Sequence, residues 1–423
     1  MRLTICVCSG IRDITVRRWN RVWRCRGKFY DYPPTIPPSL IAKGINVIEV
    51  NKIETPRETW SPPVPDDPRC AQPIPLEQQP DWKQEPAFIH HDNVRLFEGV
   101  KQACLIAKAQ HFQGFPSAVE SLVGAIDIPD KDLILQRFIM QSQKWNTDEV
   151  KLPKPFDPRK PRWSWVRPIG ITPLKSSQIL LRNIIRLCQT QIAEFPSFNT
   201  RKSIYDQPLY SHVIYKGKPI VMKESLDALL TSSDPLPPFG NEATVDASAS
   251  HKIPDMWPVF PTVDFLETNN YELSSEIGIF NSNLKLTNPH TIIQIPRKYH
   301  WEQKHYQAAQ IMTCLMYTAA LARQKYGNDV RALPEPISVQ HVSLEQNKFL
   351  FAFFQLNTLD LDSDNGIKNL VWTADRADLF TIIPGQPWMP KKLKTTRYEN
   401  FEPLAFDKFL AVYLSNLPEV AKQ

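Results

Sequence analysis

Proline is the residue that most restricts how this chain can fold. The 423 residues include 39 prolines, and 13 of these lie within residues 31–90. Because proline lacks a backbone N–H and fixes its own φ angle, such a segment cannot form long helices or central strands. We therefore expect a proline-rich extended arm over residues 31–88 that gains order by lying on a partner surface. The alternative is a disordered linker.

Positive charge is concentrated in two segments, of which the first is the N-terminal leader. Residues 1–30 hold seven arginines and one lysine against a single aspartate, a net charge of +7, whereas the whole chain carries +6. On a helix, Arg17, Arg21 and Arg24 form one cationic stripe. An arginine-rich, acid-poor, amphipathic leader is typical of a mitochondrial presequence, so we expect import into the mitochondrial matrix. The alternatives are a secretory signal, because residues 3–11 are largely apolar, and an uncleaved basic arm.

The second segment, residues 151–186, holds nine lysines and arginines against one aspartate, a net charge of +8. Its centre, residues 159–167, interleaves four cations with two tryptophans and is called the basic island below. Guanidinium groups bind RNA phosphates and indole rings stack on unpaired bases, so the island is a candidate RNA-contact site. The alternative is a basic loop packed on the protein's own acidic surface. The candidate RNA-contact residues are Arg159, Lys160, Arg162, Trp163, Trp165 and Arg167.

The spacing of glycine and cysteine excludes several enzyme classes. No two of the 13 glycines lie closer than Gly114 and Gly124. The dinucleotide fingerprint, the phosphate-binding P-loop and the nucleophile elbow of α/β-hydrolases all need closely spaced glycines. The seven cysteines contain no C-x-x-C pair, so neither a zinc ribbon nor a disulfide framework is indicated. We expect no cofactor.

Asp360, Asp362 and Asp364 form the most enzyme-like pattern in the chain. Alternating carboxylates can hold a hard cation, and paired acids at a strand end build Mg²⁺ sites in nucleases. The EF-hand interpretation fails, because its glycine and glutamate positions hold Asn365 and Val371. A metal-dependent nuclease, or its degenerate descendant, is therefore the alternative function, against a simple acidic turn that leaves a strand. The nine histidines form no metal pair on a helix, and each is expected to be a surface residue or a satisfied core residue.

Apolar residues recur at helical spacing between residues 89 and 200, which predicts a helical region that includes a basic connector. Its inward-facing side chains are expected to include Phe97, Leu133 and Trp145. Residues 231–258 are rich in proline and serine and are expected to form a loop.

From residue 201 the pattern changes to that of a mixed α+β domain, which we expect to span residues 201–423. Lys216-Gly217-Lys218 predicts a β-hairpin, and residues 345–347 predict the turn of another. Residues 301–326 are apolar on every side in their middle, which favours a buried core helix over a coiled coil. The predicted fold is α+β: an N-terminal proline-rich extension, a helical region, and a mixed antiparallel sheet with a long core helix.

Five segments resemble one known family. Residues 326–342, 354–362 and 366–372, together with 96–103 and 406–414, are similar to the mitochondrial large ribosomal subunit protein thirty-seven family. The leader and the proline arm resemble nothing closely. The basic island also departs from the family's pattern, so the RNA contact proposed for it is an inference from this chain alone.

The resemblance implies a structural constituent of the mitochondrial large ribosomal subunit, without a cofactor or catalytic activity. Such a protein supports mitochondrial translation through protein–protein contacts and contacts with the large-subunit rRNA. The resemblance also implies a paralogous partner, the mitochondrial ribosomal protein known as programmed cell death protein nine. Outside the leader the chain is close to neutral, which favours protein neighbours over rRNA for much of its surface.

We predict that residues 1 to about 30 are removed on import, because the leader has the charge pattern of a cleaved presequence. Mass spectrometry of the N-terminal peptide from mitochondria checks this prediction. Recovery of intact Met1 on the imported protein would contradict it.

Overall fold

The computed structural model describes residues 36–45, 75–91, 94–145, 149–154, 167, 169–191, 195–274, 276–277, 288–297, 301–383 and 396–417. The chain divides into two compact units, Met1–Pro73 and Ile74–Gln423. In the first unit the described residues form one short helix, α2 (Pro38–Ala42), with proline at its first position, where the missing N–H is not needed. The predicted presequence and most of the predicted arm lie outside the described residues.

The second unit is built on one mixed sheet, which has eleven strands within the described residues. Parallel pairing joins β1 to β6, β9 to β10 and β2 to β12, and the other neighbours are antiparallel. This mixed sheet with its helices confirms the predicted α+β class. The main strand order is β2 (Ala109–Gln113), β12 (Asn369–Thr373), β11 (Lys348–Thr358), β10 (Ala332–Glu345), β9 (Asn288–Gln294), β6 (Lys218–Ser232), β1 (Trp82–His90) and β7 (Leu266–Asn270). Three further strands pair outside this order: β5 (Arg201–Tyr215) with β6, β8 (Glu276–Ile277) with β5, and β13 (Ala377–Asp378) with β11.

Two tight hairpins set the register of the sheet. Lys216 and Gly217 join β5 to β6 with φ angles of 48° and 78°, the left-handed pair that a two-residue turn of the primed type requires. Gln346, with a φ angle of 56°, joins β10 to β11, where Glu345 pairs with Lys348. Both hairpins confirm the sequence prediction.

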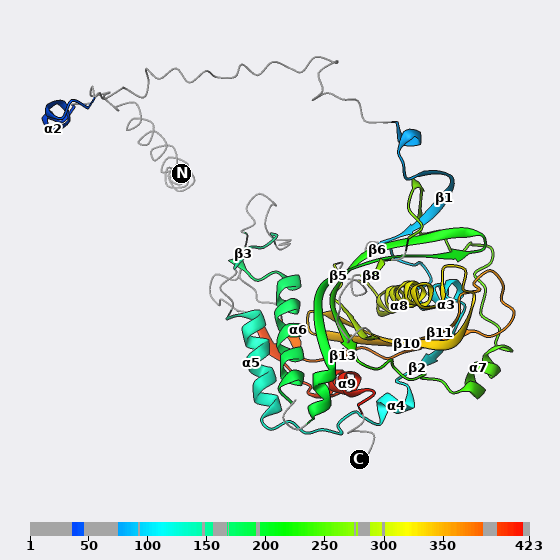
Figure 1. Ribbon diagram of the computed structural model, residues 1–423. Coiled ribbons are helices and arrows are strands. Elements are labelled where there is room, and N and C mark those ends of the chain that lie inside the picture. Colours follow the sequence, from blue (N-terminus) through cyan, green and yellow to red (C-terminus); the bar gives the residue numbers. More distant parts are fainter. Residues whose placement is uncertain are drawn as a thin grey trace, which may run out of the picture. The chain divides into compact units, whose positions relative to one another are not determined.

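Helices cover both faces of the sheet (Figure 1). On one face lie α8 (Gln303–Tyr326) and α3 (Val100–Ile106), and on the other α5 (Lys131–Gln143), α6 (Pro173–Thr190) and α9 (Leu404–Leu414). The alternation of side chains along β11 shows the two sides, because Phe351 and Phe353 pack with α9 whereas Phe354 packs with α8. Within the described residues, no helix has the length and apolar character that a membrane span needs.

Helix α8 is the long core helix that the sequence predicts. Eighteen of its 24 residues are buried, on all sides of the helix rather than along one stripe. A helix with this pattern is stable only when protein surrounds it. The sheet curves around α8, and α3 packs beside it (Figure 1).

Three side chains that the sequence analysis places inward are exposed, so those predictions are wrong. Phe97 is 65% exposed because α3 begins only after Gly99, whose φ of 64° lets the chain turn into the helix. Leu133 is 55% exposed because Leu135 and Ile139 form the inner face of α5. Trp145 is 62% exposed because α5 ends at Gln143.

Two further differences involve segments rich in proline. Strand β1 lies between β6 and β7, although no central strand was expected within residues 31–90. Its Pro86 falls where the pairing with β7 shifts register, a position at which the missing N–H is tolerated. The expected loop of residues 231–258 contains a short helix, α7 (Glu242–Ser248), whose Asn241 side chain caps the N–H of Thr244 at 2.9 Å.

We predict that Phe353→Ala lowers the free energy of unfolding by about 3–5 kcal/mol. The Phe353 ring is fully buried and lies 5.1 Å from the ring of Phe115 and 5.6 Å from that of Phe239. Phe97→Ala is the matched control, since it removes the same atoms from an exposed position and should cost less than about 0.5 kcal/mol. Urea unfolding followed by circular dichroism measures both, and equal losses would disprove the assignment of the core.

Candidate functional site

Most of the basic island lies outside the described residues. Only Arg167 of the six candidate RNA-contact residues is described, and it is exposed; Arg159, Lys160, Arg162, Trp163 and Trp165 are not described. The short antiparallel pair of β3 (Val150–Lys151) and β4 (Ile169–Gly170) joins the residues that precede the basic island to those that follow it. RNA contact by the island therefore stays a prediction.

The acidic loop, residues 360–366, is described, and its backbone binds two lysines. Lys108 Nζ donates to the carbonyl oxygens of Asp360 at 3.0 Å and Asn365 at 2.7 Å. Lys368 Nζ donates to the carbonyl oxygens of Asp364 and Gly366, the latter at 3.0 Å. The loop thus turns its carbonyl oxygens onto ammonium groups of the protein itself.

Both lysines are almost completely buried, with 3% of Lys108 and 1% of Lys368 exposed. Burial, and then the neighbouring charge of Lys108, lowers the pKa of Lys368. A buried ammonium group is stable only when acceptors surround it, so these lysines and the loop stabilise one another.

The three aspartates of the loop do not converge on a common point with other ligands. Asp360 Oδ2 lies 3.8 Å from Lys108 Nζ, and Arg331 lies 4.0 Å from Asp360 and 3.9 Å from Asp362. Asp362 Oδ1 also accepts from the N–H of Gly217 at 3.3 Å. Across the described ranges, no group of three or more His, Cys, Asp or Glu residues is placed to hold a metal ion. The carboxylates of Asp360 and Asp362 contact cations, an N–H group and the hydroxyl group of Ser363.

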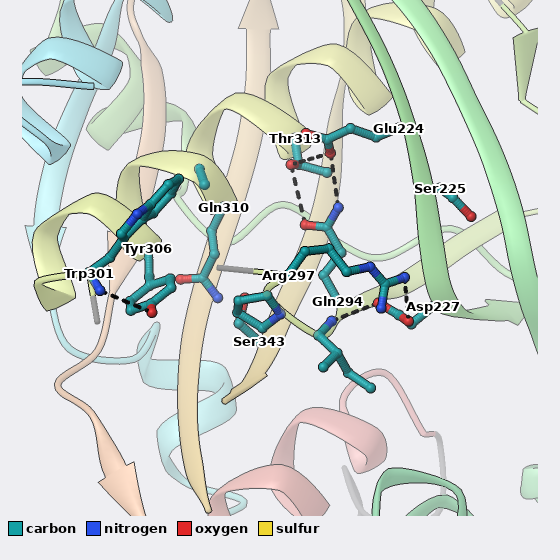
Figure 2. Close-up of a pocket in the computed structure, with 13 residues that line it drawn as sticks. Glu224, Ser225, Asp227, Gln294, Arg297, Trp301, Tyr306, Gln310, Thr313 and Ser343 are labelled. Atoms are coloured by element: carbon teal, nitrogen blue, oxygen red, sulfur yellow. Dashed lines mark hydrogen bonds and ion pairs between the residues drawn. The ribbon is translucent and has the colours of Figure 1, made fainter. Parts of the chain in front are cut away.

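A second polar cluster lies between α8 and the sheet (Figure 2). Glu224 of β6, Gln294 of β9 and His341 of β10 form a row across three neighbouring strands. Gln294 Nε2 donates to Glu224 Oε2 at 2.9 Å, and Gln294 Oε1 lies 2.9 Å from His341 Nε2. Gln310 of α8 completes the row, with its Nε2 3.2 Å from His341 Nδ1 and 3.0 Å from the carbonyl oxygen of Leu350.

The hydrogen bonds of this row have one direction. An amide nitrogen can only donate, so His341 Nδ1 accepts from Gln310 and His341 Nε2 carries the ring proton. The donors from Gln310 through His341 and Gln294 thus form a chain that ends at Glu224, whose Oε2 also lies 3.2 Å from Thr313 Oγ1. Burial lowers the pKa of His341 to about 3, which keeps the ring neutral at pH 7.

His90 of β1 extends the row to a fourth strand. Its Nδ1 lies 3.6 Å from Glu224 Oε1, and its ring packs against Phe265 at 5.8 Å. Burial, followed by the neighbouring His91, lowers the pKa of His90 to about 4. Both histidines are therefore neutral at pH 7. His341 is hydrogen-bonded within the row, whereas neither ring nitrogen of His90 has a hydrogen-bond partner among the described residues.

The pocket beside this row is small. Its volume is about 60 Å³, whereas pockets for metabolites measure roughly 300–1,000 Å³. At its mouth Arg297 Nη2 pairs with Asp227 Oδ1 at 3.0 Å, and the N–H of Ile295 donates to Asp227 Oδ2 at 2.7 Å. Burial raises the pKa of Asp227, while these two donors act in the opposite direction. The pocket has room for water between ordered side chains and not for a substrate.

The described cysteines have no features of a nucleophile. Cys104, Cys188 and Cys314 are buried and free. Burial raises the pKa of Cys104 to about 12 and raises those of the other two as well. A thiol is reactive only as a thiolate, so these side chains act as core residues.

The polar row and the lysine contacts were not predicted from the sequence, because the histidines and the acidic run are each isolated from most of their partners along the chain. His341 and Gln294 gave no distinct signal, because β10 and β9 each contain several other polar residues. Pairing these residues requires the strand order, which no local pattern contains.

We predict that His341→Gln makes the protein less sensitive to acid. An unfolded histidine with the ordinary pKa of 6.5 takes up a proton at pH 5, whereas folded His341 stays neutral. The unfolded state binds more protons, so the free energy of unfolding falls as the pH drops from about 6.5 toward 3. For one such histidine, the free energy of unfolding is lower at pH 5 by about 2 kcal/mol.

Urea unfolding of the original chain and of the variant at pH 7 and at pH 5 measures this effect. The difference between the two pH values should be smaller in His341→Gln by about 2 kcal/mol. An unchanged difference would show that His341 is already protonated in the folded state.

Comparison with known proteins places the chain in a family. No model of a known protein family matches it. Large ribosomal subunit protein mL37 of Rattus norvegicus is 30% identical over 359 residues, which cover 82% of this chain and 79% of the relative. The proteins of the same name from Gallus gallus and Bos taurus are 28% and 29% identical over 368 and 349 residues, covering 85% and 80% of this chain and 79% and 78% of the relatives. The resemblance found in the sequence is confirmed, and the chain belongs to the large ribosomal subunit protein mL37 family.

Proposed function

We propose that this protein is a structural constituent of the mitochondrial large ribosomal subunit and supports mitochondrial translation. The observation that carries the proposal is the similarity to mL37 over 82% of the chain, because it spans most of the folded unit rather than one motif. The name of that relative refers to the large ribosomal subunit.

The leader supports a location in the mitochondrial matrix. Its net charge of +7 and its one-sided arginine stripe suit import by the matrix route. A ribosomal protein that works on mitochondrial translation acts in the same compartment.

The protein acts through contacts rather than catalysis. The acidic loop binds Lys108 and Lys368, and Glu224 accepts a hydrogen bond from the neutral side chain of Gln294. Neither arrangement pairs a nucleophile with a base, as a catalytic site requires. No observation on Asp360, Asp362 and Asp364 favours the nuclease alternative.

Two kinds of partner follow from this proposal. The first is protein neighbours in the subunit, including the paralogous programmed cell death protein nine that the sequence resemblance implies. The second is the large-subunit rRNA, for which the basic island is the candidate contact. The near-neutral charge of the chain outside its leader favours a larger share for the protein neighbours.

Sedimentation of a mitochondrial lysate on a sucrose gradient tests the proposal. The chain should travel with the large subunit and move to lighter fractions when ribonuclease destroys the particle. A chain that stays in the light fractions of an intact lysate is not a ribosomal constituent.

We predict that neutralising Arg159, Lys160, Arg162 and Arg167 weakens attachment to rRNA and reduces its salt dependence. The slope of log affinity against log salt should fall by about 0.7 for each lost contact with a single strand. Trp163→Ala with Trp165→Ala should weaken binding with little change in that slope, because stacking releases few counterions. Filter binding of the purified chain to large-subunit rRNA across a salt series measures both.

A matched control replaces four exposed cations that lie outside the basic island and form ion pairs with carboxylates. Lys304, Lys325, Arg376 and Arg397 have this property, and their replacement by glutamine makes the same change in net charge. If the control lowers affinity and slope as much as the island variant does, the island has no special part in RNA binding.

A further inference from the structure

Helices α5 and α6, with the segment between them, carry a net positive charge that exceeds that of the whole chain. Residues 131–190 contain twelve lysines and arginines against four acids, a net charge of +8, whereas the whole chain carries +6. Helix α6 contains no acid, and α5 contains one, Asp132. Most of the basic island lies outside the described residues, but both helices are described. They therefore show how part of this charge is presented.

Each of the two helices has one exposed side, and its cations lie there. On α5 the exposed cations are Arg137 and Lys144, the second at the end of the helix. They are seven residues apart, a spacing that puts both on one side of a helix. On α6 the exposed cations are Arg182 and Arg186, which are four residues apart and therefore lie one above the other.

The two exposed sides adjoin one another. Helices α5 and α6 lie side by side (Figure 1), and Asn183 Nδ2 of α6 donates to Gln141 Oε1 of α5 at 3.1 Å. The two cations of α5 lie about one helical turn before and after Gln141, and those of α6 lie within about one turn of Asn183. The four side chains, called the cationic face below, are Arg137, Lys144, Arg182 and Arg186.

Tyrosine rings orient part of the cationic face. The guanidinium group of Arg182 lies 5.2 Å from the centre of the Tyr205 ring, and Lys144 Nζ lies 5.8 Å from the centre of the Tyr398 ring. Burial raises the pKa of Tyr205, and the charges of Arg182 and Arg186 act in the opposite direction, so both arginines lie near its hydroxyl group. A ring holds a cation in place without removing its charge.

The charges of the face are not neutralised by the described carboxylates. Within the described residues, none of the four cations forms an ion pair, whereas the neighbouring Lys131 pairs with Asp407 at 2.8 Å. Asp132 is five residues before Arg137, which places it about 140° away around α5. Asp206, the residue after Tyr205, is exposed and forms no ion pair with a described cation. The face therefore offers four positive charges to a partner.

The other exposed side chains decide between RNA and an acidic protein as that partner. Interfaces between proteins have an apolar core that is depleted in charge, whereas interfaces with nucleic acids are more polar and strongly positive. From Gly170 to Val213, no large apolar side chain of the described residues is exposed. On the α5 side the exposed ones are Leu133 and Trp145. Trp145 follows Lys144, and an exposed indole beside a cation suits stacking on an unpaired base.

We propose that the cationic face is a second RNA-binding surface, separate in residues from the basic island. Its four cations contact backbone phosphates, and Trp145 stacks on an unpaired base. This inference rests on the proposed function, because the RNA is the large-subunit rRNA. Contacts with phosphates carry no sequence information, so the face fixes the position of α5 and α6 on the RNA rather than choosing a sequence.

Site-specific photo-crosslinking in intact mitochondria tests the proposal. The full chain carries benzoylphenylalanine in place of Leu133, which is 55% exposed and lies one turn before Arg137. The expected product is a crosslink to large-subunit rRNA, recognised by its sensitivity to ribonuclease and located by primer extension. A crosslink to protein alone, or no crosslink, would overturn the proposal.

Substitution of the face measures its share in RNA binding. One variant combines Arg137→Gln, Lys144→Gln, Arg182→Gln and Arg186→Gln. In filter binding of the full chain to large-subunit rRNA, the slope of log affinity against log salt should fall by about 0.7 for each lost contact with a single strand, or about 3 in all. An unchanged slope, with circular dichroism showing an intact fold, would remove the face as an RNA contact.

Two controls separate charge at this place from other effects. Arg137→Lys with Arg182→Lys and Arg186→Lys retains the charge, so the salt slope should stay as in the original chain. A loss of slope in this variant would show that the arginines stabilise the fold instead. The second control replaces Lys304, Lys325, Arg376 and Arg397 by glutamine and should also leave the slope unchanged. Equal losses in this control and in the glutamine variant of the face would overturn the proposal.

Sedimentation of the same mitochondria separates this inference from the proposed function. A chain that travels with the large subunit but gives no RNA crosslink from position 133 leaves the function standing and removes the cationic face. A chain that gives an RNA crosslink but stays in the light fractions keeps the face as an RNA-binding surface and removes the ribosomal role.

Discussion

The structure depends on the complete enclosure of helix α8. Because the helix is buried all round, its polar side chains must find partners inside the protein. Gln307 Nε2 donates to the carbonyl oxygen of Ala374 at 3.0 Å, and His305 Nδ1 lies 2.8 Å from the carbonyl oxygen of Leu96. These contacts fix the rotation and the height of α8 against segments that are distant in sequence. A polar group left without its partner costs more than a hydrogen bond contributes, so the fit of sheet to helix is specific as well as apolar.

The same principle accounts for the contacts of the acidic loop. Once Lys108 and Lys368 are buried at the edge of the core, their ammonium groups need several acceptors. The carbonyl oxygens of residues 360–366 supply them, and the aspartate side chains remain at the surface near Arg331. A loop with alternating acids can therefore bind a metal ion through its carboxylates or bind buried lysines through its carbonyl oxygens. The side chains that the fold places beside the loop decide between these two roles.

Sequence patterns predicted the elements whose signal is local. The β5–β6 hairpin follows from Lys216-Gly217, and α8 follows from a long apolar run that ends at Gly327. The errors at Phe97 and Trp145 arose where a helix boundary moved by a few residues, which turns a side chain from the core to solvent. The row from His90 to His341 was not predictable, because it joins four strands whose order follows from long-range pairing.

The two kinds of polar chemistry in this protein have different consequences for its role. The described interior contains neutral histidines, and it contains lysines whose ammonium groups are paired with carbonyl oxygens. Its charge contrast lies instead between segments, with net charge +8 over residues 151–186 and five acids without a cation over residues 253–276. Opposite charges on different segments of one chain suit a protein that joins unlike neighbours, because each segment attracts one class of partner and repels the other.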